Sequence, residues 1–366
     1  MKPSAPASRA RGEAECQRSP KQRRKSMIKL SIWRTFAAGV MALSLLGWSA
    51  TVKAAEWANP DLLLSAETLK QNIGKADWAV IDCRALKAYA KGHIPGAISL
   101  GKRCKKALRD VTARAFRNIS KYESLLGKVG IGNDTHVVFY YDGIGTITDA
   151  TVGFWILEYL GHDKAHVLNG GLDAWRKAGN RLEAKPTIRK AATFKANVKA
   201  SAYSETEEIL RIATGSLKDV QLLDSRTKAE FVGKDIRAIR GGRVPNTDLN
   251  VSHLDTLAQA KDPKTGKMGP ISYFDPNVVA EKFASLDKNK RTVAYCQTGT
   301  RSTMTYLQLR LLGFKDPANW DESWRVYGSQ LDYPVAGEQW YNFAGVNKKI
   351  KALEKKVKTI EAAAKK

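Results

Sequence analysis

Residues 292–302 read Thr-Val-Ala-Tyr-Cys-Gln-Thr-Gly-Thr-Arg-Ser. Three of the first four residues, Thr292, Val293 and Tyr295, are β-branched or aromatic types that favour a β-strand, and apolar residues recur at helical spacing from Met304 to Leu312. The segment between the two patterns is polar and contains a glycine. The sequence therefore predicts a strand, a short loop and a helix, with Cys296 in the loop that opens the helix.

A cysteine at this position has chemical consequences. The first N–H groups of a helix lack partners within the helix, and a tight loop before it can aim further N–H groups inward, so the site favours an anion. A thiolate there has a lowered pKa. Arg301 would add positive charge at the rim, and Gly299 allows the loop to wrap around the sulfur. The alternative, a core cysteine without chemistry, is the weaker interpretation because polar residues follow Cys296.

The loop resembles the active-site loop of the rhodanese family, sulfurtransferases that carry sulfur as a cysteine persulfide. The family pattern is a cysteine, four residues with a glycine at the third position after the cysteine, and a closing Arg or Thr. Cys296, Gly299 and Arg301 match this pattern. Related phosphatases of the same fold have one more residue between the cysteine and the arginine, so the shorter spacing favours sulfur chemistry over phosphate chemistry.

An internal repeat extends this resemblance over residues 60–340. Asp82 and Arg84 follow one apolar run, and Asp224 and Arg226 follow another. The resemblance implies an α/β fold of two tandem rhodanese-like domains, each a mainly parallel sheet flanked by helices. We interpret Asp224 and Arg226 as a structural pair near the site, joined by a charge-assisted hydrogen bond.

The first half is expected to lack catalytic activity. Aligning Tyr141 with Tyr295 puts Asp142 at the position of Cys296. A carboxylate cannot form a persulfide, and two-domain rhodaneses typically keep the cysteine only in the second repeat. We expect the first domain to form one wall of a substrate cleft at the domain interface.

The predicted organisation has five parts. They are an N-terminal extension and signal peptide (1–54), a silent rhodanese-like domain (55–190), a linker (191–202), a catalytic rhodanese-like domain (203–345) and a Lys-rich amphipathic helical tail (346–366). In the tail, apolar residues from Ile350 to Ile360 recur at spacings of three, four and three. Packing on its own domain, self-association and contact with anionic lipid are the open interpretations of this helix.

Residues 1–54 have the three parts of a secretory signal: a basic start, an apolar stretch from Phe36 to Ala50, and small residues before a cleavage site at Ala55. We expect the true start at Met27 and a periplasmic location if the cell is Gram-negative, with an uncleaved membrane anchor as the alternative.

The mature chain would hold three cysteines, Cys83, Cys104 and Cys296. Cys83 and Cys104 are interpreted as two buried structural thiols, and a disulfide between them is the alternative. No metal-ligand spacing is present, and no cofactor is expected.

The formal net charge is +25. Part of this excess lies in the N-terminal extension and in the Lys-rich tail, and the excess that remains on the body suits small anionic substrates or a membrane surface. Nucleic-acid binding is disfavoured because the excess charge is spread along the chain and the N-terminus predicts export.

The resemblance implies covalent catalysis in which Cys296 takes sulfur from a small anionic donor and passes it to a thiol or cyanide. The residues expected to bind the substrate are Gln297, Thr298, Gly299, Thr300, Arg301 and Ser302. This loop matches neither the Cys-Arg-Lys-Gly-Val-Thr of thiosulfate enzymes nor the Cys-Gly-Ser-Gly-Val-Thr of mercaptopyruvate enzymes. The charge of Arg301 favours thiosulfate. The alternatives are transfer from 3-mercaptopyruvate and a persulfide carrier or redox module that serves a specific protein partner.

Overall fold

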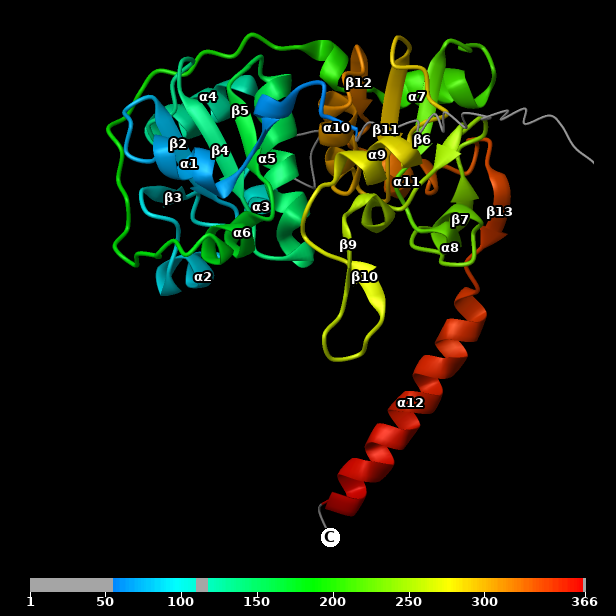
Figure 1. Ribbon diagram of the computed structural model, residues 1–366. Coiled ribbons are helices and arrows are strands. Elements are labelled where there is room, and N and C mark those ends of the chain that lie inside the picture. The colour runs from blue at the N-terminus through cyan, green and yellow to red at the C-terminus, as the bar shows by residue number, and fades with distance from the viewer. Residues whose placement is uncertain (1–54, 110–117, 365–366) are drawn as a thin grey trace, which may run out of the picture. The chain divides into compact units, whose positions relative to one another are not determined.

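The structure, a computed structural model, describes residues 55–109 and 118–364. The predicted signal peptide, its cleavage site and the predicted start at Met27 lie outside these residues, except that Ala55 is the first described residue. Two parallel β-sheets, one from each half of the chain, carry helices on their faces (Figure 1). The predicted α/β fold with two tandem domains is confirmed.

The first sheet has five strands in the order β1-β5-β4-β2-β3, and every neighbouring pair is parallel. Its strands are β1 (Leu63–Leu64), β2 (Trp78–Asp82), β3 (Ala97–Ser99), β4 (His136–Tyr140) and β5 (Ala165–Leu168). The helices of this half are α1 (Ala66–Asn72), α2 (Leu86–Lys91), α3 (Cys104–Ala107), α4 (Ile119–Lys128), α5 (Ile147–Tyr159) and α6 (Gly171–Lys177). Short 3-10 turns form η1 (Pro60–Leu62) and η3 (Ile144–Thr146). Side chains of α1 and α6 pack in one core, and those of α4 and α5 pack in another.

The second sheet has four parallel strands in the order β12-β11-β6-β8. Its strands are β6 (Val220–Asp224), β8 (Leu249–Asn250), β11 (Arg291–Tyr295) and β12 (Asp316–Asn319). The helices are α7 (Thr206–Ala213), α8 (Lys228–Phe231), α9 (Pro276–Lys282), α10 (Ser302–Leu311), α11 (Ser323–Tyr327) and α12 (Phe343–Ala364), with η4 (Ala200–Ala202) and η5 (His253–Thr256). Two antiparallel pairs join β7 (Arg240–Arg243) to β13 (Ala336–Trp340) and β9 (Gln259–Lys261) to β10 (Met268–Pro270).

The internal repeat is visible in the register of the central strands. Asp82 at the end of β2 pairs with Tyr140 of β4, and Asp224 at the end of β6 pairs with Tyr295 of β11. The two tyrosines are therefore equivalent positions in the two sheets.

This register corrects the expected alignment of the halves by one residue. Tyr141, not Asp142, takes the position of Cys296. The error arose because two consecutive tyrosines precede Asp142, and the sequence alone does not decide which of them matches Tyr295. Tyr141 has no thiol either, so the lack of catalysis in the first half stays a prediction that now rests on a different residue.

Helix α10 is anchored in the first half of the chain. Its side chains Tyr306 and Leu307 belong to the core that α5 shares with the first sheet, and α5 is buried around almost its whole circumference. Arg310 of α10 forms an ion pair with Glu158 of α5 at 2.8 Å. The predicted linker also packs there, because Phe194 is buried in the same core. The helix that begins at the Cys296 loop is thus held by both halves.

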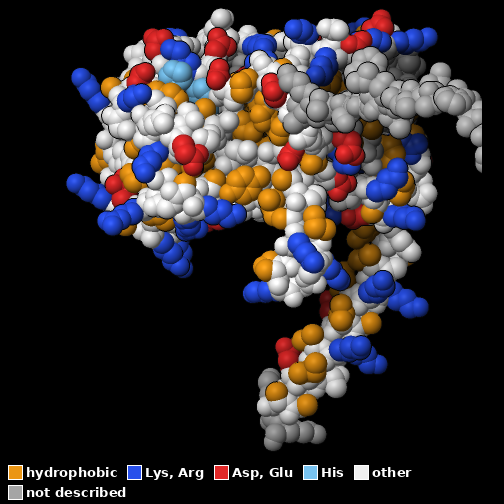
Figure 2. Space-filling model, in the orientation of Figure 1, with side chains coloured by type: hydrophobic (Ala, Val, Ile, Leu, Met, Phe, Trp, Pro, Cys, Tyr) orange, Lys and Arg blue, Asp and Glu red, His pale blue; other side chains and the backbone are white. Residues whose placement is uncertain are grey.

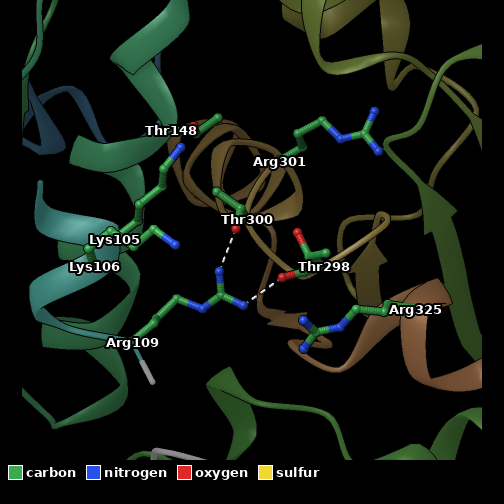
Figure 3. A pocket seen from close by; sticks show the side chains of 8 residues that line it. All are labelled: Lys105, Lys106, Arg109, Thr148, Thr298, Thr300, Arg301 and Arg325. Carbon is green, nitrogen blue, oxygen red and sulfur yellow. Dashed lines mark hydrogen bonds between the residues drawn. The ribbon is translucent and has the colours of Figure 1, made fainter. Parts of the chain in front are cut away.

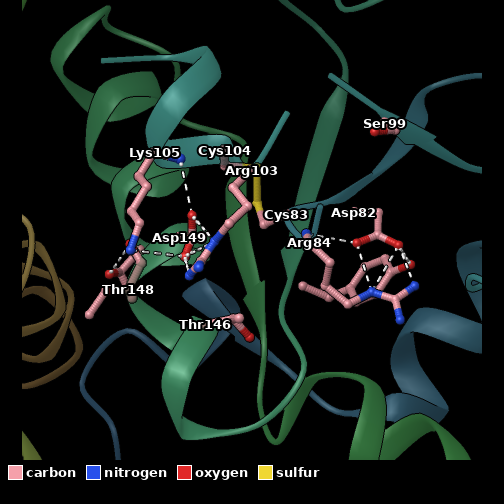
Figure 4. The surroundings of a disulfide bond; sticks show 12 residues. Asp82, Cys83, Arg84, Ser99, Arg103, Cys104, Lys105, Thr146, Thr148 and Asp149 are labelled. Carbon is pink, nitrogen blue, oxygen red and sulfur yellow. Dashed lines mark hydrogen bonds and ion pairs between the residues drawn. A yellow bond between two sulfur atoms is a disulfide. The ribbon is translucent and has the colours of Figure 1, made fainter. Parts of the chain in front are cut away.

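Cys83 and Cys104 form a disulfide, with their Cα atoms 4.7 Å apart (Figure 4). The expectation of two free buried thiols was therefore wrong. Cys83 directly follows β2, and the chain returns through α2 and β3 to place Cys104 beside it at the start of α3. The spacing in sequence does not reveal this return. Among the described cysteines, Cys296 is the one without a bridge.

The double variant Cys83→Ala/Cys104→Ala should be less stable than the wild type by about 3 kcal/mol, because a bridge across a loop of this length restricts the unfolded chain. The two cysteines are 21 residues apart in the sequence. Urea unfolding followed by tryptophan fluorescence measures the difference. Reductant should lower the midpoint of the wild type and leave that of the double variant unchanged. If the double variant is as stable as the wild type, and reductant does not shift the wild-type midpoint, the bridge does not stabilise the protein.

Candidate active site

Cys296 lies between β11, which ends at Tyr295, and α10, which begins at Ser302. This is the strand, loop and helix that the sequence predicts. The backbone N–H groups of Cys296 and Gly299 both donate to the hydroxyl of Ser323, at 3.1 and 3.0 Å. That one hydroxyl therefore ties the start of the loop to its middle.

Gly299 has the conformation that the loop requires. Its φ is +69°, in the region that side-chain-bearing residues rarely adopt. A Cβ atom at this position would also collide with the backbone of Asp321. No other residue type fits at Gly299 without moving the loop.

The Cys296 side chain has no exposed surface. Burial alone would raise the pKa of its thiol, but the charge of Arg301 and the N–H groups of Thr298 and Ser302 lower the pKa below its usual value overall. The Ser302 hydroxyl lies 3.6 Å from the sulfur. These contacts all favour the thiolate, which is the nucleophilic form of a cysteine.

Arg301 forms an ion pair that the sequence does not predict. Its two terminal nitrogens donate to both carboxylate oxygens of Glu230, each at 2.7 Å. Burial opposes ionisation of Glu230, yet the hydrogen bonds and charge of Arg301 lower the pKa of that carboxyl to about 2. Arg301 was expected to supply positive charge at the rim of the loop, and the structure shows that its terminal nitrogens bind a fully buried carboxylate.

The remaining loop residues divide into two groups. Thr298 and Thr300 line a pocket, together with Arg301. Gln297 turns elsewhere: its amide donates to the carbonyl of Arg237 at 2.8 Å, and it is not among the lining residues that the structure describes. The substrate-binding role predicted for Gln297 has no support from its position.

The pocket has a volume of about 410 Å³ and lies between the two halves of the chain, where a cleft was expected (Figure 3). Its described lining residues are Lys105, Lys106, Arg109, Thr148, Thr298, Thr300, Arg301 and Arg325. Five of these eight are Lys or Arg and none is acidic, so the pocket suits an anion. Whether substrate binds there remains a prediction.

Arg109 connects the first half directly to the loop. Its guanidinium donates to the backbone carbonyl of Thr298 at 2.5 Å and to the hydroxyl of Thr300 (Figure 3). It also pairs with Asp321 at 2.7 Å. Burial raises the pKa of Asp321, and the charge of Arg109 opposes that rise. This side chain thus fixes the pocket side of the loop from the opposite domain.

Lys105 and Lys106 come from α3, which starts at the bridged Cys104 (Figure 4). Lys105 lies 3.6 Å from the buried carboxylate of Asp149 on α5. Burial, more than any other cause, lowers the pKa of Lys105. Lys106 is exposed and forms no ion pair with any residue that the structure describes.

Asp224 and Arg226 form a buried ion pair at 2.7 Å. Arg226 also donates to the carbonyl of Gly242 at 2.8 Å and lies over the ring of Trp324. These contacts fasten the end of β6 to neighbouring segments, and neither residue lines the pocket. Their position agrees with the structural role that the sequence predicts.

Sequence reasoning missed the cationic wall from the first half. The available signal was the dense run of basic residues from Lys102 to Arg109, but nothing in the sequence places this run against a loop nearly two hundred residues away. Glu230 and Ser323 were also missed, since each contacts the loop from a separate helix.

Within residues 55–109 and 118–364, no cluster of three or more His, Cys, Asp or Glu side chains is arranged to hold a metal ion. Over the same ranges, no helix combines the length and the apolar character needed to cross a membrane.

Removing the Arg301 charge should raise the pKa of the Cys296 thiol, because the cation stabilises the thiolate. The suitable variant is Arg301→Gln/Glu230→Gln, which removes both partners and leaves no unpaired buried carboxylate. Thiolate absorbance against pH, as a difference from Cys296→Ala, reports the titration. In the wild type the thiolate should persist below the ordinary thiol pKa of about 8.5 and be lost as the pH falls through the lowered value.

Arg301→Lys is the matched control for this experiment. It keeps a positive charge but loses the two-pronged contact, so its titration should lie between those of the wild type and the neutral double variant. Identical titrations of the wild type and the double variant would show that Arg301 does not control the thiol.

Comparisons with known proteins agree with this geometry. The rhodanese-like domain family matches residues 65–178 and again 211–330. The thiosulfate sulfurtransferase of Corynebacterium glutamicum is 29% identical over 308 residues, which cover 80% of this chain and 96% of that protein. A Saccharopolyspora erythraea protein that carries the same name provisionally is 31% identical over 291 residues, which cover 76% of this chain and 97% of that one.

Solved structures share the fold. An anaerobic ergothioneine biosynthesis enzyme of Chlorobium limicola aligns with a TM-score of 0.63 at 18% identity, covering 76% of this chain and 71% of the enzyme. A 3-mercaptopyruvate sulfotransferase of Escherichia coli aligns with a TM-score of 0.60 at 21% identity, covering 72% of this chain and 98% of that one. Because the two family matches together span more than half of the sequence, this chain belongs to the rhodanese family and carries two tandem rhodanese-like domains.

Proposed function

We propose that this protein is a sulfurtransferase that carries sulfane sulfur as a persulfide on Cys296. The observation that supports this most strongly is the loop itself, in which a cysteine of lowered pKa precedes a buried helix and lies beside a cationic pocket. The relatives named as thiosulfate sulfurtransferases are similar over nearly their whole length.

In the first half-reaction, the Cys296 thiolate attacks the outer sulfur of thiosulfate. A sulfur–sulfur bond to Cys296 forms as the bond to the leaving sulfite breaks, and sulfite departs with the electron pair of that bond. The enzyme is left as a Cys296 persulfide anion. The total charge is unchanged and no oxidant is needed.

The N–H groups of Thr298 and Ser302 that favour the thiolate also favour the persulfide anion, because its charge lies at the same end of α10. In the second half-reaction, an acceptor such as cyanide or a thiolate attacks the outer sulfur. The Cys296 thiolate then leaves, and the enzyme returns to its starting state.

The pocket supports an anionic donor through different residues than the sequence suggests. Arg301 is paired with Glu230, so its charge is largely compensated. Lys106, from the opposite domain, is a lining cation with no ion pair among the described residues. Thiosulfate, a compact dianion, gains most from such a pocket. 3-Mercaptopyruvate is also anionic and is the second candidate, which the Escherichia coli structure favours.

The burial of Cys296 constrains how the donor enters. Because the sulfur has no exposed surface, side chains that cover it must shift before a donor makes contact. Thr298 and Thr300 of the loop line the pocket, and Arg109 holds the Thr298 carbonyl and the Thr300 hydroxyl in place. The same enclosure works against a large protein partner, which could not enter a 410 Å³ pocket.

We further propose that the protein is exported through its N-terminal signal. The disulfide between Cys83 and Cys104 supports this, since such bridges persist in oxidising compartments. The mass of protein recovered from the producing cells tests the proposal: a chain that begins at Ala55 supports export, and an unprocessed chain contradicts it.

Thiosulfate should add the mass of one sulfur atom to the protein, and cyanide should remove it. Intact-mass spectrometry before and after each reagent measures both steps. Cys296→Ala should gain nothing, whereas Cys83→Ala/Cys104→Ala should load as the wild type does, because the bridged cysteines take no part. Loading by 3-mercaptopyruvate alone would replace the proposed donor. Loading by neither donor, with Cys296 shown to be reduced, would reject a small-molecule sulfurtransferase and point to a protein partner.

Lys106→Ala should slow loading by thiosulfate about tenfold at low salt, because a lining cation raises the local concentration of an anionic donor. Single-turnover loading at increasing ionic strength measures the effect, which salt should diminish. Lys102→Ala is the matched control: Lys102 is an exposed lysine of the same basic run that does not line the pocket. Equal rates for the two variants would remove Lys106 from donor recognition.

A further inference from the structure

Helix α12, Phe343–Ala364, carries an apolar stripe that no described part of the chain covers. None of its residues is buried. Its large apolar side chains are well exposed, at 46% for Ile350, 59% for Leu353, 50% for Val357 and 68% for Ile360. Figure 2 shows hydrophobic side chains lying open along this helix beside Lys side chains. Of the three open interpretations of the tail, packing on its own domain is the one that the structure contradicts.

The stripe follows a heptad repeat over the whole helix. Its members alternate at spacings of three and four: Phe343, Val346, Ile350, Leu353, Val357, Ile360 and Ala364. In a heptad abcdefg, these residues occupy the a and d positions, beginning with Phe343 at a. Ile350 and Val357 at a, with Leu353 at d between them, form the combination that favours two parallel strands in a coiled coil.

The residues that directly flank the stripe, at the e and g positions, carry opposite charges on its two sides. The helix has only two acidic residues, Glu354 and Glu361, and both fall at e positions on one flank. Lys349 and Lys356 fall at g positions on the other flank. In a parallel pair of helices, each g residue meets the e residue five positions later on its partner. Lys349 would then face Glu354 of the second copy, and Lys356 would face Glu361.

We propose that α12 pairs with α12 of a second copy of this chain as a parallel two-stranded coiled coil. Burial of the stripe drives the association, and four interhelical ion pairs fix its orientation. An antiparallel pair would instead oppose g to g and e to e, which places lysine against lysine and glutamate against glutamate. This assembly is independent of the proposed sulfur chemistry.

The flanking charges also decide between a second copy and a lipid surface. A helix that lies on anionic lipid gains from lysines on both sides of its apolar face. Here both glutamates lie at e, directly beside the stripe, where such a surface repels them, and the lysines of that side, Lys351 and Lys358, lie further from the stripe at b. The same glutamates complete the pairing with a second copy. The arrangement therefore favours self-association.

Charge-reversal variants of the full chain test the proposal. The wild type should sediment as a dimer at micromolar concentration, and Lys349→Glu/Lys356→Glu should be a monomer, as should Glu354→Lys/Glu361→Lys. An equimolar mixture of the two variants should restore the dimer, because each then presents the charge that the other lacks. All four sites are exposed, so these substitutions leave the folded domains intact, which circular dichroism checks.

Each other outcome of this experiment overturns the proposal. A monomeric wild type over the whole concentration range rejects self-association. A mixture that stays monomeric rejects the parallel g-to-e pairing. A trimer rejects the two-stranded form. Binding to phosphatidylglycerol vesicles distinguishes contact with lipid from self-association. If the wild type stays monomeric and Glu354→Lys/Glu361→Lys binds the vesicles more tightly than the wild type, α12 is a membrane-surface helix instead.

Discussion

A thiolate buried at Cys296 needs compensating charge inside the protein, because no water reaches it. Arg301 and the N–H groups at the start of α10 supply that compensation. Arg301 is itself largely buried and needs a counter-charge, which Glu230 provides. Glu230 in turn forms a capping box with Thr227 at the start of α8. One buried charge thus accounts for a chain of contacts that reaches from the loop to a separate helix.

The second constraint is that the loop belongs to one domain while much of its pocket belongs to the other. Arg109 holds the loop through Thr298 and Thr300, and Lys106 contributes charge from the same side. The first half need not keep a thiol to matter for the chemistry. Its contribution is the placement of cations at an interface that the second half could not build alone. The disulfide at Cys104 holds the start of that cationic segment to the first sheet.

The sequence predicted the features that neighbouring residues determine, and it did not predict those that depend on contacts between distant segments. The Cys296 loop was predictable because strand, glycine and helix signals adjoin it, and parallel sheets followed from their alternation along the chain. Arg109 and Lys106 were not predictable, because their role arises only when α5 packs against α10. The expected equivalence of Asp142 with Cys296 failed for a different reason: tandem tyrosines fit two alignments equally well, and only strand register separates them.

The burial of α5 on nearly all sides has a consequence for the chain as a whole. One of its faces completes the first sheet's core, and another receives Tyr306 and Leu307 of α10. Glu158 sits in that contact and is paired with Arg310. If either half were excised, it would leave a broad apolar face and a stranded charge in water. We therefore expect the two halves that the structure describes to unfold together, so that neither repeat behaves as an interchangeable module.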